Sequence, residues 1–289
     1  MTPAEQASAA DEFWRAAERF NEKAERLGYR DIRNYYWYHT VELPDGLITP
    51  GQYDFRETIA AFPFPRDMRG MRVLDVGSAT GFFAFEFARR GAHVISVELP
   101  SLYALDRFPG QDIEQILESI RRMMGPRASD LAGAGPRYSA DEMYFYLLEG
   151  PFEFCRKQLG FPIERCYSTV YELNEAKIGG AVDLAFMGDI LLHTLNPLQA
   201  LAAVAPLART LVLSQMVPEG IEEPPAIAYV GGDSLDSDDV SWWLPNEACL
   251  MALLKKLGFP KVTHAGDHIG TMRPSGYEYR RRPILLAQK

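Results

Sequence analysis

A strand–turn–helix–strand pattern in the first third of the chain most constrains its fold. A short apolar run at 72–76 is followed by a turn from Gly77 to Gly81, a helical pattern at 82–90 and a second apolar run at 93–98. Two strands joined by such a helical crossover pair in parallel, with the helix packed on one face of the sheet. The pattern therefore predicts a doubly wound α/β sheet.

The rest of the chain continues this alternation of strands and helices. Apolar, β-branched runs alternate with segments of helical spacing, which is typical of one large α/β domain. We expect further strands at 165–170, 182–187, 209–216, 261–265 and 279–287, and helices at 151–159, 197–207 and 245–257.

About seventy residues precede the first strand, and we expect this lead-in, residues 1–70, to pack on the sheet domain, residues 71–289. A helix is expected to begin at Thr2, a capping residue followed by Pro3, and to end at Gly28. After it we expect an aromatic stretch at 35–39, a short helix at 52–60 and a proline-punctuated linker at 61–70.

Residues 101–150 do not fit the alternation, because the segment is too long for a plain connection. It holds a helical pattern around 113–120, a Gly/Ala/Pro break at 132–136 and an aromatic patch that includes Tyr144. We interpret it as an inserted cap over the carboxyl ends of the strands.

Charge and cysteine content narrow the class of protein. The 289 residues include 30 Lys and Arg against 39 Asp and Glu, a formal net charge of −9, which argues against a nucleic-acid or membrane-surface partner. The three cysteines form no CxxC pair, and the first residues carry charges where a signal peptide has an apolar core. We expect a cytoplasmic protein with no metal site and no membrane span; the oligomeric state is left open.

The glycine turn and the acid that follows it predict a ligand. Gly77 and Gly81 let the backbone turn sharply. Glu98 ends the neighbouring strand, where a carboxylate can accept hydrogen bonds from both hydroxyl groups of a ribose. A nicotinamide dinucleotide site has the spacing G-x-G-x-x-G, whereas here it is G-x-x-x-G. Asp75, just before the turn, would repel a pyrophosphate and attract an ammonium group. The pattern indicates an adenosine-bearing ligand with a cationic tail.

With these residues the sequence resembles the class I S-adenosylmethionine-dependent methyltransferases, whose first two motifs are similar to VLDVGSATGFFAFEFARRGAHVISVE. The resemblance implies a Rossmann-like fold with a mostly parallel, seven-stranded doubly wound sheet that ends in an antiparallel hairpin, and S-adenosyl-L-methionine as cofactor. The cofactor-binding residues that it implies are Tyr38, Asp75, Gly77, Ser78, Gly81, Glu98, Leu99, Val170, Tyr171, Met187 and Gly188.

A narrower resemblance concerns residues 37–46, 49–51 and 242–246, with Met187 and Gly188. It points to the family of the tRNA wobble-uridine carboxymethyltransferase, which uses carboxy-S-adenosylmethionine, and its relatives. A carboxylated cofactor needs cationic partners, yet residues 34–55 contain no Lys or Arg, and the acidic chain shows no basic stripe for phosphates.

Methyl transfer to a hydroxyl or amine needs a group that removes a proton. His39 and His193 are the candidate bases, and Asp189 would orient His193 if the turn between them is helical. Aromatic side chains are expected to line the acceptor, namely Trp37, Tyr138, Tyr144 and Tyr146.

The leading hypothesis is therefore a methyltransferase that uses S-adenosylmethionine to methylate an O or N atom of a small molecule, in a specialised metabolic pathway. One alternative is an RNA-modifying enzyme that carboxymethylates a wobble uridine of tRNA. Another is a protein that binds the cofactor without catalysis.

Overall fold

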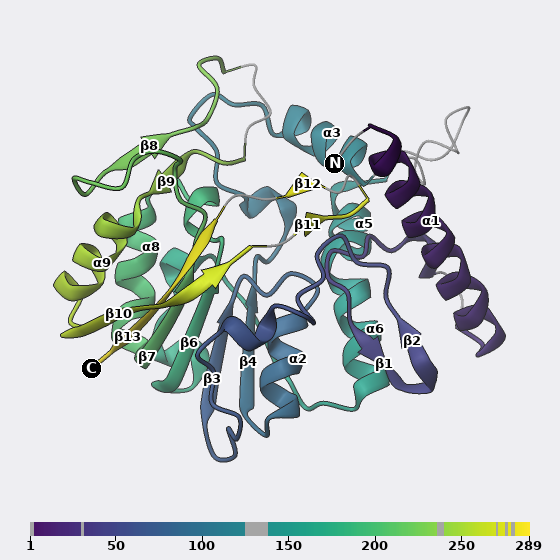
Figure 1. Ribbon diagram of the computed structural model, residues 1–289, viewed down its shortest axis with the longest axis horizontal. Helices are drawn as coiled ribbons and strands as arrows, with labels where there is room; N and C mark the ends of the chain where they lie inside the picture. Colours follow the sequence, from purple (N-terminus) through teal and green to yellow (C-terminus); the bar gives the residue numbers. More distant parts are fainter. Residues whose placement is uncertain are drawn as a thin grey trace.

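The computed structural model describes residues 3–29, 32–124, 138–235, 240–269, 271–274, 277–278 and 281–289. Its centre is a seven-stranded sheet with the order β10-β13-β7-β6-β3-β4-β5 (Figure 1). Only β13 runs against its neighbours. The predicted doubly wound, mostly parallel sheet with a terminal antiparallel hairpin is confirmed. The strands are β3 (Arg72–Val76), β4 (His93–Glu98), β5 (Glu164–Tyr167), β6 (Val182–Gly188), β7 (Ala208–Ser214), β10 (Lys261–His268) and β13 (Arg282–Gln288).

Alternate residues of each central strand point to opposite faces, and both faces are covered. Val73 and Phe186 belong to the core on one face, whereas Leu74 and Ala185 belong to the core on the other. This explains why the central strands are apolar throughout rather than alternating. The first face carries α2 (Phe82–Arg89) and α6 (Gly150–Leu159), and the second carries α7 (Glu175–Ile178), α8 (Pro197–Val204) and α9 (Glu247–Lys256).

The lead-in packs on the first face and shares its core. α1 (Pro3–Arg26) buries Ala17, Phe20 and Ala24, which recur at helical spacing, against Trp37 and the sheet. The helix is followed by Gly28, as predicted, whereas the capping residue Thr2 lies outside the described residues. After a single turn, η1 (Ile32–Asn34), come a hairpin, β1 (Glu42–Leu43) and β2 (Leu47–Ile48), and the turn η2 (Pro44–Gly46) that joins its strands.

The short helix predicted at 52–60 is wrong. Only one turn, η3 (Ile59–Ala61), forms there. Tyr53 instead lies in extended backbone, in bridge partnership with His39 on one side and Met272 on the other. Pairing with segments distant in the sequence therefore overrides the local helical pattern.

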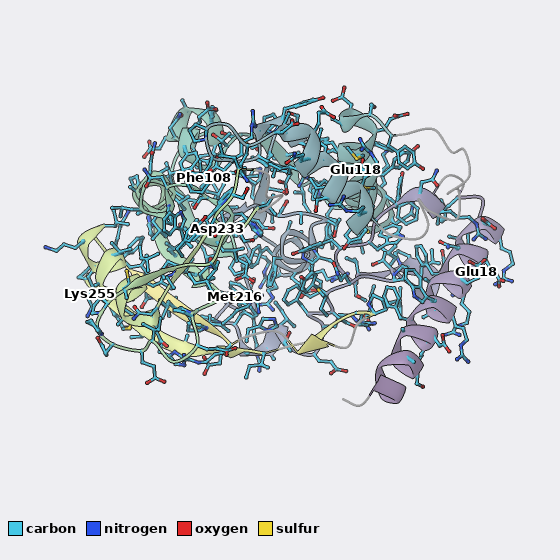
Figure 2. All side chains as sticks on the ribbon, turned by 90° about the horizontal axis from the view of Figure 1, so that it is seen from above. Glu18, Phe108, Glu118, Met216, Asp233 and Lys255 are labelled. Atoms are coloured by element: carbon cyan, nitrogen blue, oxygen red, sulfur yellow. The ribbon has the colours of Figure 1, made fainter. Side chains whose placement is uncertain are left out.

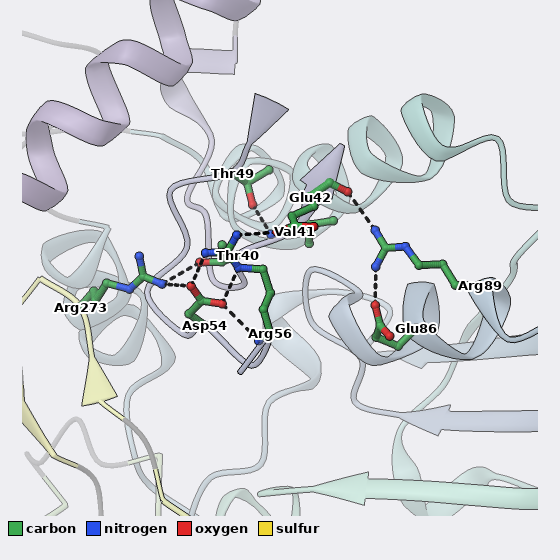
Figure 3. Close-up of polar contacts among 9 residues, drawn as sticks. All are labelled: Thr40, Val41, Glu42, Thr49, Asp54, Arg56, Glu86, Arg89 and Arg273. Carbon is green, nitrogen blue, oxygen red and sulfur yellow. Dashed lines mark hydrogen bonds and ion pairs between the residues drawn. The ribbon is translucent and has the colours of Figure 1, made fainter. Parts of the chain in front are cut away.

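An ionic network fixes this part of the lead-in (Figure 3). Asp54 pairs with Arg56 at 2.7 Å and with Arg273, and Arg56 reaches Glu42 at 2.8 Å. Arg89 of α2 donates to the Glu42 carbonyl at 2.9 Å. The lead-in is thus tied both to α2 and to the segment between β10 and β13.

The 101–150 insertion has its own small core. Leu102, Leu117, Met143 and Leu147 are buried together, with Tyr36 of the lead-in packed against them. The predicted helical pattern corresponds to α3, and the break at 132–136 lies outside the described residues. The elements are η4 (Leu102–Ala104), α3 (Ile113–Met123), α5 (Ala140–Tyr144) and the π-helical η5 (Phe145–Glu149), which continues into α6.

Two further segments lie at the same end of the molecule, in the upper part of Figure 1, opposite the C-terminus. A hairpin of β8 (Ile227–Tyr229) and β9 (Trp243–Pro245), not predicted from the sequence, follows β7, and a second hairpin of β11 (Thr271–Met272) and β12 (Tyr277–Glu278) joins β10 to β13. Figure 2 looks down on this end, where Phe108 of the insertion packs edge-on against Trp242 at a ring distance of 6.0 Å. The 101–150 insertion is therefore in contact with the segment that carries the β8–β9 hairpin at this end of the molecule.

The remaining element boundaries differ from the prediction by a few residues. The strand expected at 165–170 ends at Tyr167, and the chain then turns into η6 (Val170–Glu172). The helix expected at 197–207 ends as α8 at Val204 and tightens into η8 (Ala205–Leu207), where Pro206 has no N–H for a helical bond. No helix among the residues that the structure describes is long and apolar enough to span a membrane.

Candidate cofactor site at the carboxyl edge

The turn between β3 and α2 needs its two glycines. Gly77 and Gly81 have φ values of +69° and +90°, a region that residues with a Cβ rarely adopt. A Cβ at Gly81 would lie 2.7 Å from the ring of Phe152, and a Cβ at Gly77 would overlap the side chain of Ile190. Both positions therefore combine an unusual backbone conformation with close packing.

Most of the backbone N–H groups of this turn, those of Gly77, Ser78, Ala79 and Gly81, are already bound to acceptors of the protein itself. The bonds are Gly77 N and Ser78 N to the Val97 carbonyl (3.0 and 3.1 Å), Ala79 N to Glu98 Oε2 (2.8 Å), Gly81 N to the Ser78 carbonyl (2.8 Å) and Phe82 N to His39 Nδ1 (3.3 Å). A pyrophosphate is held by free N–H groups at such a helix start. These bonds and the two nearby carboxylates make the turn a poor anion site.

Asp75 lies at the end of β3 and is 2% exposed. Its Oδ2 has no hydrogen-bond partner among the described residues. Burial raises the pKa of Asp75 to about 7, with Arg165 opposing this shift and Glu98 adding to it. A buried carboxylate oxygen without a partner is costly, and a cationic donor would satisfy it.

Glu98 ends β4 and is also buried. Its carboxylate accepts hydrogen bonds from Ala79 N at 2.8 Å and from Leu99 N at 2.9 Å. Burial raises the pKa of Glu98, whereas Arg165 and these two N–H groups oppose the shift. The carboxylate is therefore held in one orientation beside the glycine turn.

Sequence reasoning missed Arg165 and Glu149, which complete the charge around the turn. Arg165 on β5 reaches Ser78 Oγ at 2.6 Å and forms a buried ion pair with Glu149 at 2.7 Å. The available signal was an arginine at the start of the strand predicted at 165–170, since such a charge is rarely buried without a partner.

His39 lies next to the turn, but its geometry is that of a helix cap. Its Nδ1 accepts the N–H of Phe82, the first residue of α2, and its own N–H donates to Thr80 Oγ1 at 3.0 Å. Because Nδ1 is an acceptor, Nε2 carries the proton in the neutral ring. Burial lowers the pKa of His39 to about 3. His39 therefore has no ring nitrogen free to take up a proton near neutral pH.

His193 has the opposite tautomer and is exposed. Its Nδ1 lies 2.6 Å from the Val240 carbonyl, so that Nδ1 must carry the proton and Nε2 keeps its lone pair. Ser241 Oγ also lies 3.2 Å from Nδ1. Nε2 can therefore accept a proton; burial lowers the pKa of His193, and the Val240 carbonyl and the charge of Asp189 oppose this shift.

The condition under which Asp189 would orient His193, a helical turn that contains both residues, is not met. The turn η7 (Leu191–His193) starts after Asp189, which itself has a φ of +50°. Its carboxylate binds Met216 N at 2.7 Å and pairs with Arg282 of β13. The ring of His193 is oriented by Val240 instead.

The hydroxyl groups of two predicted residues, Tyr144 and Tyr171, bond to segments next to the site. Tyr144, expected at the acceptor, donates to the Leu99 carbonyl at 2.5 Å and so lies at the end of β4, beside Glu98. The hydroxyl of Tyr171 bonds Asp106 of the insertion and accepts Asn196 N at 3.2 Å. Both tyrosines thus connect strand ends to covering segments.

The other predicted residues are buried in the core or half-buried. Trp37 is 4% exposed and packs against Phe20 at a ring distance of 5.2 Å, and the side chain of Met187, on β6, is buried in the core on the second face of the sheet. Tyr138 and Tyr146 pack on each other at 5.0 Å within the insertion. The half-buried members of the set are Tyr38, whose ring lies 4.6 Å from that of Tyr53, Gly188, which ends β6, and Val170, which begins η6. Among the residues with described positions, no three His, Cys, Asp or Glu side chains are grouped as a metal site would need.

Comparisons with known proteins extend the description of the fold. No protein-family model and no curated protein match the chain. The N-terminal domain of EvdMO1, crystallised in the presence of SAH (S-adenosylhomocysteine) and D-fucose, is 17% identical over 91% of this chain and 96% of that chain, with a TM-score of 0.53. The structure of the same domain with SAH bound is 17% identical over 94% of this chain and 96% of that chain, with a TM-score of 0.51. At such identity the likeness shows a shared fold.

A third similar structure is the 1,6-didemethyltoxoflavin-N1-methyltransferase of Burkholderia thailandensis. It was crystallised with 1,6-didemethyltoxoflavin and S-adenosylhomocysteine bound, and it is 16% identical over 76% of this chain and 72% of that chain, with a TM-score of 0.45.

Proposed function

We propose that the protein is an S-adenosylmethionine-dependent methyltransferase that acts on an O or N atom of a small molecule, of the kind found in specialised metabolism. The observation that carries the proposal is the partnerless Oδ2 of Asp75, buried beside a glycine turn in which the N–H groups of Gly77, Ser78, Ala79 and Gly81 are occupied. A site with these properties favours a cationic group and disfavours a phosphate.

The residues at the turn fit the cofactor group by group. Asp75 would bind its ammonium group, Glu98 would accept hydrogen bonds from the ribose hydroxyls, and Val170, Tyr171 and Leu99 would flank the adenine. When bound, S-adenosylmethionine supplies an electrophilic methyl group on a sulfonium. The N-terminal domain of EvdMO1, which has the same fold and was crystallised twice with SAH, supports this choice.

The charges of the described residues favour the uncarboxylated cofactor. An additional carboxylate would need a cation, and three arginines at the carboxyl edge are engaged: Arg282 with Asp189, Arg273 with Asp54, and Arg165 with Glu149. Displacing Arg282 or Arg165 would leave the carboxylate of Asp189 or Glu149 without its ion pair, which is costly.

The strand order indicates where the acceptor would bind. Glu98 on β4 and the turn after β3 would hold the adenosine and the amino-acid part of the cofactor, so the far side of the turn is formed by β6 and β7. His193 follows β6 and offers an exposed Nε2 with a lone pair. We therefore assign His193, and not the capping His39, as the general base that takes the proton of an acceptor hydroxyl or amine.

A small acceptor is favoured over RNA by charge. The net charge of −9 opposes binding to a polyanion, and the arginines of the carboxyl edge named above are paired with carboxylates. The likeness to a domain crystallised in the presence of D-fucose also supports a small acceptor.

Calorimetric titration with S-adenosylmethionine, S-adenosylhomocysteine and NAD⁺ tests the cofactor. We expect both adenosyl compounds to bind and NAD⁺ not to bind, with binding weakened by Glu98→Gln. NAD⁺ binding without S-adenosylmethionine binding would overturn the proposal.

Release of S-adenosylhomocysteine, measured by mass spectrometry with a panel of phenols, amines and glycosides, then tests the acceptor class. Turnover with tRNA alone, falling steeply with salt, would favour the RNA-modifying alternative. Cofactor binding without turnover of any acceptor would favour the alternative of a protein that binds the cofactor without catalysis.

A further inference from the structure

We propose that Arg165 is a positioning residue that holds the glycine turn and Glu98 in place for the cofactor and couples both to the 101–150 insertion. The inference rests on the proposed function for its cofactor. One end of the guanidinium binds the turn directly, since Nη1 lies 2.6 Å from Ser78 Oγ and 2.9 Å from Ser96 Oγ. Ser78 and Ser96 are themselves 2.6 Å apart, so Arg165 fixes the turn against β4.

The other end of the guanidinium binds the insertion. Nε and Nη2 of Arg165 lie 3.1 and 2.7 Å from Oε1 of Glu149, the last residue of η5. The second oxygen of Glu149 accepts the hydroxyl of Tyr167 at 2.7 Å. Tyr144, one turn earlier in the insertion, donates to the Leu99 carbonyl at 2.5 Å, next to Glu98. The insertion and the cofactor side of the sheet thus share one hydrogen-bonded network.

Arg165 is held rigidly enough for this role. Its side chain is 7% exposed, and the guanidinium lies 3.9 Å from the ring centre of Phe152, which also packs on Gly81. A planar guanidinium bonded at both ends and stacked on a ring loses little further freedom when a ligand binds nearby. A lysine could not make these contacts at the same time.

The charge of Arg165 also sets the ionisation of the carboxylates that the cofactor needs. Four carboxylates face it: Asp75, Glu98, Glu149 and Glu153. Two phenols, Tyr144 and Tyr167, are the other titratable groups in this cluster. Arg165 lowers the pKa of both Asp75 and Glu98 against the effect of burial, so removing its charge would leave both carboxyls protonated to a higher pH.

The test uses the double variant Arg165→Met/Glu149→Gln, because removing the arginine alone would leave Glu149 buried and unpaired. Arg69→Met is the control, since Arg69 pairs with Asp67 at 2.6 Å before the start of β3, at the opposite end of that strand from the turn. Calorimetry with S-adenosylmethionine at pH 6, 6.5 and 7, where the ammonium group of the cofactor stays charged, measures affinity and its dependence on pH. If the pKa of Asp75 rises by one unit in the double variant, affinity at pH 7 falls about five-fold, and the gain in affinity from pH 6 to pH 7 rises from about five-fold to about nine-fold.

Hydrogen exchange of residues 138–149 in the free proteins supplies a readout that does not depend on the cofactor. We expect faster exchange there in the double variant and no change in Arg69→Met. If the wild type binds the cofactor and the double variant has the same affinity, the same pH dependence of affinity and the same exchange rates, the role of Arg165 is overturned and the proposed function stands. No binding by the wild type would overturn the proposed function, and the exchange result would then still decide whether Arg165 couples the turn to the insertion.

Discussion

Asp75 is expected to make cofactor binding depend on pH in the neutral range. Burial raises its pKa to about 7, so in the free protein the carboxyl group of Asp75 is about half protonated at pH 7. An ammonium group binds the ionised carboxylate, and protons therefore compete with the cofactor below the pKa. The ionised fraction rises from about one in eleven at pH 6 to one half at pH 7, which predicts about five-fold tighter binding at pH 7.

The sign follows from the direction of the shift. A carboxyl whose pKa is raised in the free protein loses its proton when a cation binds, so affinity increases with pH and protons are released. About 0.9 proton per cofactor should be released at pH 6 and about 0.5 at pH 7. The α-amino group of the cofactor, with an ordinary pKa of about 7.7–8.0, stays charged in this window.

Titration calorimetry in two buffers of different ionisation enthalpy measures both affinity and proton release. Asp75→Asn is the control, because it keeps the shape of the side chain and removes the titration. The charged neighbours are Glu98 and Arg165, which act on Asp75. His39 does not interfere, because burial lowers its pKa to about 3.

Equal affinity at pH 6 and pH 7 in the wild type would refute this reasoning, as would the same slope in Asp75→Asn. Affinity that falls as pH rises would show that the ligand binds the protonated carboxyl, and the ammonium would then have to lie elsewhere.

Three substitutions test the remaining roles. His193→Gln should lower kcat for the accepted substrate by about 10²- to 10⁴-fold and leave cofactor affinity unchanged, whereas His264→Gln, on β10, should change neither. His39→Ala should leave the start of α2 without an acceptor, cost about 1–3 kcal/mol of unfolding free energy and lower Tm by several degrees; an unchanged Tm would contradict the capping role. Gly77→Ala should lower both Tm and cofactor affinity, because the Cβ meets a positive φ and an occupied space; calorimetry and thermal unfolding would detect a tolerated alanine.

The sheet and the glycine turn could be predicted because their signals are local. The strands at 72–76 and 93–98 have the predicted bounds, since each is a short apolar run closed by a turn signal. Glu98 was found by its place at the end of the second strand. In each case the residues that decide the structure are neighbours in the sequence.

The roles of single side chains could not be predicted in the same way, because they depend on distant partners. Arg165 meets Ser78 across 87 positions, and His39 meets Phe82 across 43. Nothing near His39 in the sequence shows that α2 starts beside its Nδ1. Likewise, the tautomer of His193 is set by the Val240 carbonyl, 47 positions away. Chemistry at this site is therefore decided by how the covering segments close over the sheet.

The lead-in illustrates this dependence, and its removal makes a decisive test. Phe20, Trp37 and Phe64 lie in the same core as Phe83 and Phe87 of α2. Deleting residues 1–70 would expose these α2 side chains, at about 1.5–3 kcal/mol for each large one, and would also remove the acceptor at the start of α2. Because native proteins have only about 5–15 kcal/mol of stability in total, residues 71–289 alone should not fold. Deleting residues 1–12 is the control, because residues 7–12 are exposed or half-buried. A soluble, cooperatively unfolding 71–289 fragment that binds S-adenosylmethionine would show instead that the glycine turn holds its shape without His39.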